Sequence, residues 1–180
     1  GGITQDSTPN DNDGTVNGAT LTSGVIGNAL DFTPSSSVQI PNVPELQLQN
    51  EGTIILWAKW DTRSSYDRIL SKEETTPGSN DGYLISLGGA GQDQFQVAFR
   101  GYTQGSDEGF ISEPGMFPAG EWHQLGFTFT TTGIQAYFDG QPVSTTGAGA
   151  LEWGGSTNNY DLVLGDAGNG FLPFDGQVDD

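Results

Sequence analysis

The stretch GEWHQLGFTFTTTGIQAYFDGQPV, residues 120–143, decides the fold class. Its apolar side chains recur at every second position, which is the period of a β-strand with one buried face. The side chains that share a face are Leu125, Phe127 and Phe129 in the first run and Ile134, Ala136 and Phe138 in the second. Asp139-Gly140 follows the second run, and this pair tolerates the positive φ angles of a type I′ turn. The stretch therefore predicts antiparallel strands and a tight hairpin.

The same period of two recurs on both sides of this stretch. Further strands are expected at NALDF, SVQIP, RILSK, GYLISL, FQVAF, YDLVLG and FDGQVDD. TIILWAKW, residues 53–60, is apolar at odd and even positions alike, which is typical of a central strand covered on both faces. No window of a dozen residues keeps a helical stripe. The chain is therefore expected to be all-β, a two-sheet antiparallel jelly-roll sandwich.

Composition limits the class of function. The chain has 180 residues, enough for one domain with a sizeable core, and it carries 23 acidic against 5 basic side chains, a net charge of −18. Such a charge repels phosphate backbones and anionic lipids, which argues against nucleic-acid binding. The chain has no cysteine, and no apolar run approaches the roughly 20 residues of a membrane span, so no membrane insertion is expected. Self-repulsion of this size suits a salty or calcium-rich medium outside the cell.

Three stretches in order resemble the laminin-G-like, concanavalin A-like lectin/glucanase jelly-roll family. They are GNALDF with VQIPN, GTIILWAKW with RILSK, and residues 120–143 with the closing LVLGDAG and FDGQVDD. The resemblance runs from about Asp6 to the end of the sequence. It implies one laminin-G-like domain over residues 1–180, expected to be a fragment of a larger protein, because family members have a strand before the acidic turn and continue past the last one.

The acidic stretch DSTPNDNDGTVNG, residues 6–18, raises the possibility of a cation site. Calcium takes six to eight oxygens from carboxylates, amides and carbonyls, and this turn offers all three. The family resemblance implies Asp6 and Asp179 as ligands of a structural calcium ion that cross-links the first and last strands; Asp11 and Asp13 are weaker candidates. The alternative is that these residues simply build turns.

Catalytic signals are weak. Glucanases of this fold carry alternating Glu-x-Asp-x-Glu carboxylates, and the sequence has no such run. His123 is the only histidine, which excludes a His-based metal cluster, and EWHQL resembles a strand start of the family, so His123 is expected to be structural. We therefore expect no enzyme activity.

Sugar binding is the stronger hypothesis, because aromatic faces and a few polar groups suffice for it. The expected ligand-binding residues lie near strand ends or in a glycine- and serine-rich loop: Trp60, Tyr66, Arg68, Tyr102, Trp153 and Tyr160. The alternative for Arg68 is a carboxylate of the protein itself. Trp57 and Trp122 resemble core positions of the family.

Two functions remain open. The first is a non-catalytic, lectin-like carbohydrate-binding or adhesion domain of a secreted or surface protein, stabilised by calcium, with a glycan or cell-surface ligand as its partner. The second is a structural or assembly module that binds other proteins through a sheet edge or its termini and binds no sugar.

Overall fold

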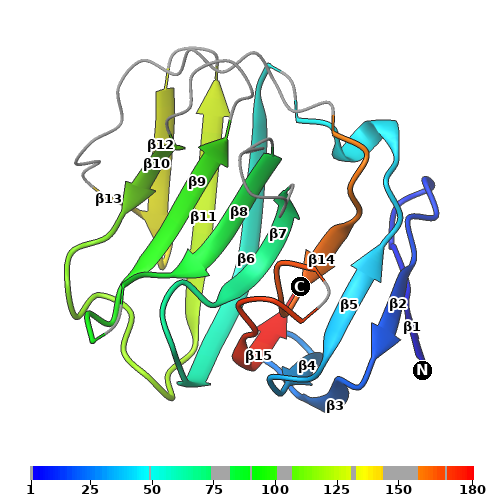
Figure 1. The fold of residues 1–180 in the computed structure, drawn as a ribbon, viewed down its shortest axis with the longest axis horizontal. Coiled ribbons are helices and arrows are strands. Elements are labelled where there is room, and N and C mark those ends of the chain that lie inside the picture. The colour runs from blue at the N-terminus through cyan, green and yellow to red at the C-terminus, as the bar shows by residue number, and fades with distance from the viewer. Residues whose placement is uncertain are drawn as a thin grey trace.

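The computed structural model describes residues 2–48, 50–73, 82–89, 91–100, 107–130, 133–143, 158–168 and 170–180. Within these ranges the chain forms two stacked antiparallel sheets, as the alternation predicted (Figure 1). The eight-stranded sheet has the spatial order β1 (Gly2–Thr4), β2 (Gly14–Asn17), β5 (Ser37–Ile40), β14 (Leu162–Leu164), β7 (Arg68–Glu73), β8 (Gly82–Leu87), β9 (Phe95–Arg100), β10 (Asp107–Ile111). The seven-stranded sheet has the order β13 (Gln141–Val143), β12 (Gly133–Phe138), β11 (His123–Thr130), β6 (Gly52–Thr62), β15 (Asp175–Asp179), β4 (Asn28–Phe32), β3 (Thr20–Ser23). The remaining element is a short 3₁₀ helix, η1 (Pro44–Leu46), and among the described residues no helix has the length and apolarity needed to cross a membrane.

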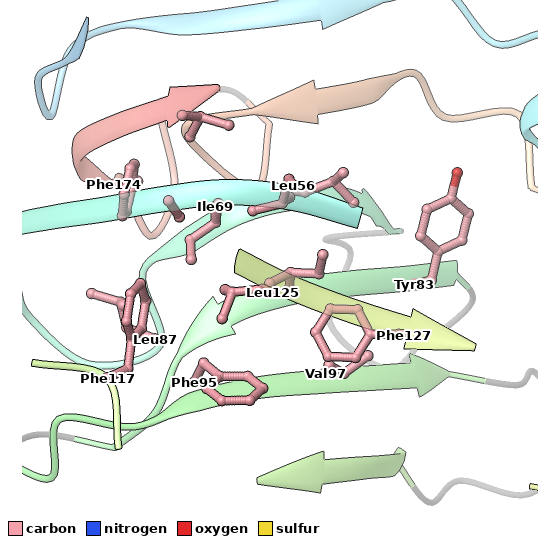
Figure 2. Packing of buried hydrophobic residues seen from close by; sticks show 14 of the residues in the cluster. Leu56, Ile69, Tyr83, Leu87, Phe95, Val97, Phe117, Leu125, Phe127 and Phe174 are labelled. Carbon is pink, nitrogen blue, oxygen red and sulfur yellow. The ribbon is translucent and has the colours of Figure 1, made fainter. Parts of the chain in front are cut away.

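The core lies between the two sheets and is dominated by aromatic rings. Figure 2 shows Leu87, Phe95 and Val97 of the eight-stranded sheet against Leu56, Leu125 and Phe127 of the seven-stranded sheet. The Phe95 ring stacks on Phe138 at 5.6 Å between centroids and lies 6.2 Å from the Phe127 ring. The inward alternation predicted for residues 120–143 is therefore confirmed.

The predicted hairpin is confirmed as well. Phe138 of β12 pairs with Gln141 of β13, so the loop has two residues. Asp139 and Gly140 have φ angles of 49° and 74°, the left-handed region that a type I′ turn requires at both positions.

The expectation that β6 is covered on both faces is wrong. Its inward side chains Leu56, Ala58 and Trp60 are buried, but Ile55 on the outward face is 57% exposed. Trp57 and Trp122 are half-buried rather than core residues, and Lys59 lies over the Trp122 ring at 5.6 Å. The outward face of β6 is thus open to solvent at Ile55.

The first and last strands do not lie side by side, contrary to the sequence-based expectation. β1 is the edge strand of the eight-stranded sheet and pairs with β2, whereas β15 lies inside the seven-stranded sheet between β6 and β4. Figure 1 places the N-terminal end at one side of the molecule and the C-terminal end nearer its centre.

Candidate functional site

A pocket of about 270 Å³ lies on the outward face of the eight-stranded sheet, where β5, β14 and β7 run next to one another. We call it the β14 pocket. Its lining residues are Ser37, Gln39, Ser71, Glu73, Asn159, Tyr160, Asp161, Val163, Asp166, Ala167 and Gly168. Most of these side chains are polar, so the pocket suits a ligand that is rich in hydrogen-bonding groups.

Strand alternation places the floor of the pocket. Val38 of β5 and Leu162 of β14 point into the core, so Gln39 and Val163 point outward. Val163 is opposite both Gln39 and Ser71 in the ladder, which brings three neighbouring strands to one spot. The floor is therefore built on the rigid part of the sheet.

A buried ion pair supports the floor at β7. The Arg68 Nε donates to Glu73 Oε1 at 2.6 Å, and the Ser71 hydroxyl donates to the same oxygen at 3.1 Å. Arg68 Nη1 also donates to the carbonyl of Tyr66 at 2.8 Å. Arg68 and Glu73 are each 5% exposed. Because a buried charge without a partner is costly, this pair holds both side chains in place.

One wall of the pocket is formed by residues 158–161, immediately before β14. Lys72 of β7 is fully buried, and its Nζ donates to the Asn158 side-chain oxygen at 2.8 Å and to the Tyr160 carbonyl at 2.7 Å. The Asn158 side-chain oxygen also accepts from the Tyr160 backbone N–H at 3.1 Å. This Lys72–Asn158 clamp fixes the backbone that carries Tyr160, whose residue is 40% exposed at the pocket.

Asp161 ties the same wall to β5. One carboxylate oxygen accepts from the Gln39 side-chain amide at 2.7 Å, and the other accepts from the Asn42 backbone N–H at 2.8 Å. Both partners are neutral, so the negative charge of Asp161 stays at the pocket.

The opposite wall follows β14. Asp166 is buried, and its two oxygens accept from the backbone N–H groups of Gly168 and Gly170 at 2.6 and 2.9 Å. Gly165 begins this loop at a φ of 93°, and a Cβ there would lie 2.5 Å from the Phe32 ring. Only glycine fits both the conformation and the space, which lets the chain turn directly over the core.

The structure divides the six predicted ligand-binding residues into different groups. Tyr160 lines the β14 pocket, and its role in ligand binding stays a prediction. Tyr66 is 47% exposed, but it does not line this pocket. Arg68 bonds Glu73, a carboxylate of the protein, which was the alternative. Tyr102 and Trp153 lie outside the described residues.

The expected exposure of Trp60 is wrong. Trp60 is 6% exposed, and its indole N–H donates to the Phe117 carbonyl at 2.9 Å. β6 continues to Thr62 rather than ending at Trp60, so the ring keeps the inward alternation of Leu56 and Ala58.

The proposed calcium ligands do not form one group. Asp6 lies in the β1–β2 turn, where its carboxylate accepts from the Thr8 N–H at 2.8 Å, the Thr8 hydroxyl at 2.7 Å and the Asn12 N–H at 3.0 Å. These bonds, led by the one from the Thr8 backbone, hold the pKa of Asp6 below its ordinary value. Asp13 accepts from the Asp6 N–H at 2.9 Å, and Asp11 has a φ of 54°. The interpretation as a turn is therefore supported for residues 6–13, and β2 begins at Gly14.

Asp179 has a different role from the one expected. It is 4% exposed on β15, and one carboxylate oxygen accepts from the N–H groups of Val25 and Ile26 at 2.7 and 2.8 Å. It clasps the β3–β4 turn. The structure gives Asp6 and Asp179 no common hydrogen-bond partner: Asp6 lies in the turn at the edge of the eight-stranded sheet and Asp179 on β15 inside the seven-stranded sheet, and across the described ranges no cluster of three or more His, Asp or Glu side chains could hold an ion. Calcium binding itself stays a prediction.

His123 is structural, as expected. Its Nδ1 lies 2.9 Å from an Asp139 carboxylate oxygen, and its ring stacks on Phe138 at 4.6 Å between centroids. It joins the hairpin turn to β11.

Sequence reasoning missed most of the β14 pocket. The missed residues are Ser37, Gln39, Ser71, Glu73, Asn159, Asp161, Val163, Asp166, Ala167 and Gly168. Part of the signal is present in SVQI, where Ser37 and Gln39 alternate with the apolar Val38 and Ile40 and are therefore expected to point outward. What the pattern could not give is that β5, β14 and β7, far apart in sequence, are neighbours in space.

Comparison with known proteins identifies the fold family. The family model described as the concanavalin A-like lectin/glucanases superfamily, in its laminin G form, matches residues 32–180. No curated protein matches the sequence.

Three solved structures illustrate the likeness of fold. The binding domain of Paraclostridial Mosquitocidal Protein 1 has a TM-score of 0.75 at 13% identity, with 97% of this chain aligned to 45% of that one. Domain 4 of AbnA, a GH43 extracellular arabinanase from Geobacillus stearothermophilus, in complex with arabinotriose, has a TM-score of 0.70 at 19% identity, covering 97% and 83% of the two chains. The CBM40 of the Ruminococcus gnavus IT-sialidase, bound to α2,3 sialyllactose, has a TM-score of 0.63 at 14% identity, covering 91% and 88%. At these identities the likeness is one of fold, and this chain spans less than half of the mosquitocidal binding domain.

Proposed function

The chain belongs to the concanavalin A-like lectin/glucanases superfamily, and on that premise we propose that it is a non-catalytic carbohydrate-binding domain of a secreted or cell-surface protein. The observation that carries the proposal is the β14 pocket, a polar hollow on a rigid sheet face with the partly exposed Tyr160 at its rim. Sugars are recognised by this combination, in which carboxylates and amides bond the hydroxyls while an aromatic ring covers the apolar face.

The pocket is pre-organised for this role. Gln39 and Asp161 bond to each other across β5 and the wall, and Asp166 is fixed by two backbone N–H groups. Side chains that are already held lose little conformational freedom when a ligand binds, which favours affinity.

The solved structures support a binding role outside the cell. The AbnA domain, from an extracellular arabinanase, was solved with arabinotriose, and the CBM40 domain was solved with sialyllactose. This chain shares their fold, so a glycan is the ligand class that we infer for it.

The geometry of the carboxylates favours binding over hydrolysis. Glycoside hydrolysis needs one carboxyl group as an acid and a second as a nucleophile or base. In the β14 pocket Glu73 is paired with Arg68, and Asp166 is held by its own loop. Asp161 likewise accepts from the Gln39 amide and the Asn42 backbone N–H, so each of the three pocket carboxylates already accepts hydrogen bonds from the protein, which supports a binding role over that of a catalytic acid and nucleophile.

A glycan array followed by isothermal titration with the best glycan tests the proposal. We expect Tyr160→Ala to weaken binding by about threefold to tenfold, since an aromatic contact contributes about 0.5–1.5 kcal/mol. Ile55→Ala is the matched control, because Ile55 is 57% exposed on the other sheet. Equal loss in both variants would move the site away from the β14 pocket, and an array without any bound glycan would refute the proposed function.

One observation favours the assembly module as a second candidate. Leu21 on the edge strand β3 is 76% exposed, and Val25 and Ile26 in the adjoining turn are 43% and 59% exposed. Exposed apolar side chains beside a sheet edge are typical of a surface that pairs with another chain. A concentration-dependent increase in mass on sizing, abolished by Leu21→Lys, would support this function.

A further inference from the structure

The charges around the β14 pocket have one sign. Glu73, Asp161 and Asp166 all line it, and the structure gives a cationic partner only for Glu73. Asp161 and Asp166 are held by amide and backbone N–H groups, which orient the carboxylates without neutralising them.

The cations of the chain whose side chains the structure describes are committed elsewhere. Lys59 lies over the Trp122 ring of the seven-stranded sheet, and Arg63 lies over the Trp60 ring at 5.3 Å. Arg68 bonds Glu73, and the Lys72 Nζ is enclosed by the Asn158 and Tyr160 oxygens. None of these four side chains lines the pocket.

The rest of the molecule strengthens the same field. A net charge of −18 on 180 residues gives a negative potential over the whole surface, and a concave site focuses it. A glycan carboxylate entering the β14 pocket would meet two carboxylates and, among the side chains that the structure describes, no guanidinium to compensate them, the group that usually recognises such a ligand.

We propose that the β14 pocket selects neutral glycans and rejects those that carry a carboxylate, such as sialylated or uronic-acid chains. This inference rests on the proposed function and specifies its ligand class. It separates this chain from the sialyllactose-bound CBM40, with which it shares a fold.

The experiment compares matched pairs on the same array and then by titration. The pairs are lactose with α2,3- and α2,6-sialyllactose, and galactose oligomers with galacturonate oligomers; arabinotriose and other neutral oligosaccharides extend the neutral set. We expect binding to neutral glycans and at least about tenfold weaker binding to each acidic counterpart. The reason is that the repulsion energy between two like charges about 5 Å apart near a protein surface exceeds the free-energy difference of a tenfold change in affinity. The difference in affinity between a neutral glycan and its acidic counterpart, called the gap below, should become smaller as the salt concentration rises, because screening weakens the repulsion.

Two variants localise the effect. Asp161→Asn keeps an oxygen for one hydrogen bond and removes the charge, so it should narrow the gap between neutral and acidic glycans. Glu121→Gln removes one charge from a side chain that is 69% exposed outside the pocket and should leave the gap unchanged. Circular dichroism melting checks that both variants fold.

The outcomes separate the two proposals. Binding of neutral glycans with a gap that closes in salt supports the inference. Acidic glycans that bind as well as or better than their neutral counterparts overturn the charge selection and leave the carbohydrate-binding function standing. A gap that is insensitive to salt and to Asp161→Asn also overturns it. If no glycan on the array binds, the carbohydrate-binding function is refuted, and this inference fails with it.

Discussion

Replacing Lys72 by methionine tests how the pocket wall is held. Lys72 is completely buried, and within the described residues its Nζ donates to the Asn158 carbonyl at 3.3 Å, the Asn158 side chain at 2.8 Å and the Tyr160 carbonyl at 2.7 Å. Methionine has a similar length and fills the same space, but it donates no hydrogen bond. The variant therefore removes the Lys72–Asn158 clamp and leaves the packing nearly unchanged.

The expected cost follows from the balance of two effects. Replacing the ammonium group by an apolar group removes the desolvation penalty of a buried charge, and this by itself favours the stability of the variant. Here two of the three acceptors are backbone carbonyls, which no side-chain change can remove from the interior. A hydrogen bond to a charged group contributes about 1.5–3 kcal/mol, and the three bonds share one donor. We expect a loss of about 3 kcal/mol in the free energy of unfolding, which for this chain length lowers Tm by about 6–12 °C.

Leu56→Ala is the matched control. Leu56 is 4% exposed on β6, and deleting a buried leucine costs about 2–5 kcal/mol without touching the clamp. Urea unfolding gives both stabilities, and native-state hydrogen exchange reports on the Tyr160 amide, which bonds to the Asn158 side chain at 3.1 Å. Lys72→Met should lose protection at Tyr160 beyond its global destabilisation, and Leu56→Ala should not. Equal stability of Lys72→Met and wild type, or equal protection at Tyr160 in both variants, would refute the reasoning.

Three further predictions concern single carboxylates. Asp179→Ala should lower the free energy of unfolding in urea by about 2–4 kcal/mol, since two N–H groups lose a charged acceptor, and Asp179→Asn should fall in between; an alanine variant as stable as wild type would contradict the clasp. Burial raises the pKa of Asp67 above its ordinary 3.8, although the Ser64 N–H and the Arg63 guanidinium oppose the shift. An acid with a raised folded-state pKa stabilises the fold below its unfolded pKa and loses that contribution as pH rises through its folded pKa. Asp67→Asn should therefore raise Tm at pH 7, and this increase in Tm should vanish below about pH 3.8. An increase in Tm that is constant with pH would exclude burial of the charged Asp67 as its cause. Calcium added to chelator-treated protein should raise Tm in a concentration-dependent way if the acidic turn binds it, and Asp13→Asn should reduce the shift; an unchanged wild-type Tm would end the calcium hypothesis.

Local patterns in the sequence were sufficient to predict the architecture. The alternation of Phe95, Val97, Leu125 and Phe127 gave both the strands and their buried faces, because a period of two allows only one inward set. The φ > 0 turn at residues 139–140 followed from its residue types. Strands with few apolar residues were harder. β2 lies within the stretch that looked like an acidic turn, and β3 carries two threonines and a serine.

The candidate site depended on neighbours that a sequence does not display. Tyr160 is a sequence candidate because it precedes an apolar run, whereas no local pattern indicates that Glu73 is the buried partner of Arg68. Trp60 was misplaced because its strand continues two residues further than the apolar run. Asp6 and Asp179 were joined by a resemblance alone. The sheet order separates them, since pairing among distant strands is set by the packing of the whole core and not by any local signal.

The position of β15 inside its sheet governs when the fold can close. Asp31 of β4 accepts a hydrogen bond from the side chain of Gln177, which lies 146 residues later in the sequence. The β3–β4 turn is held by Asp179, two residues further on. During synthesis the β3–β4 hairpin therefore leaves the ribosome with one edge unmatched and stays so until residues 175–179 emerge. Contacts of such high sequence separation slow folding and prolong exposure to aggregation. Cells that produce this domain must keep that hairpin from finding another partner first.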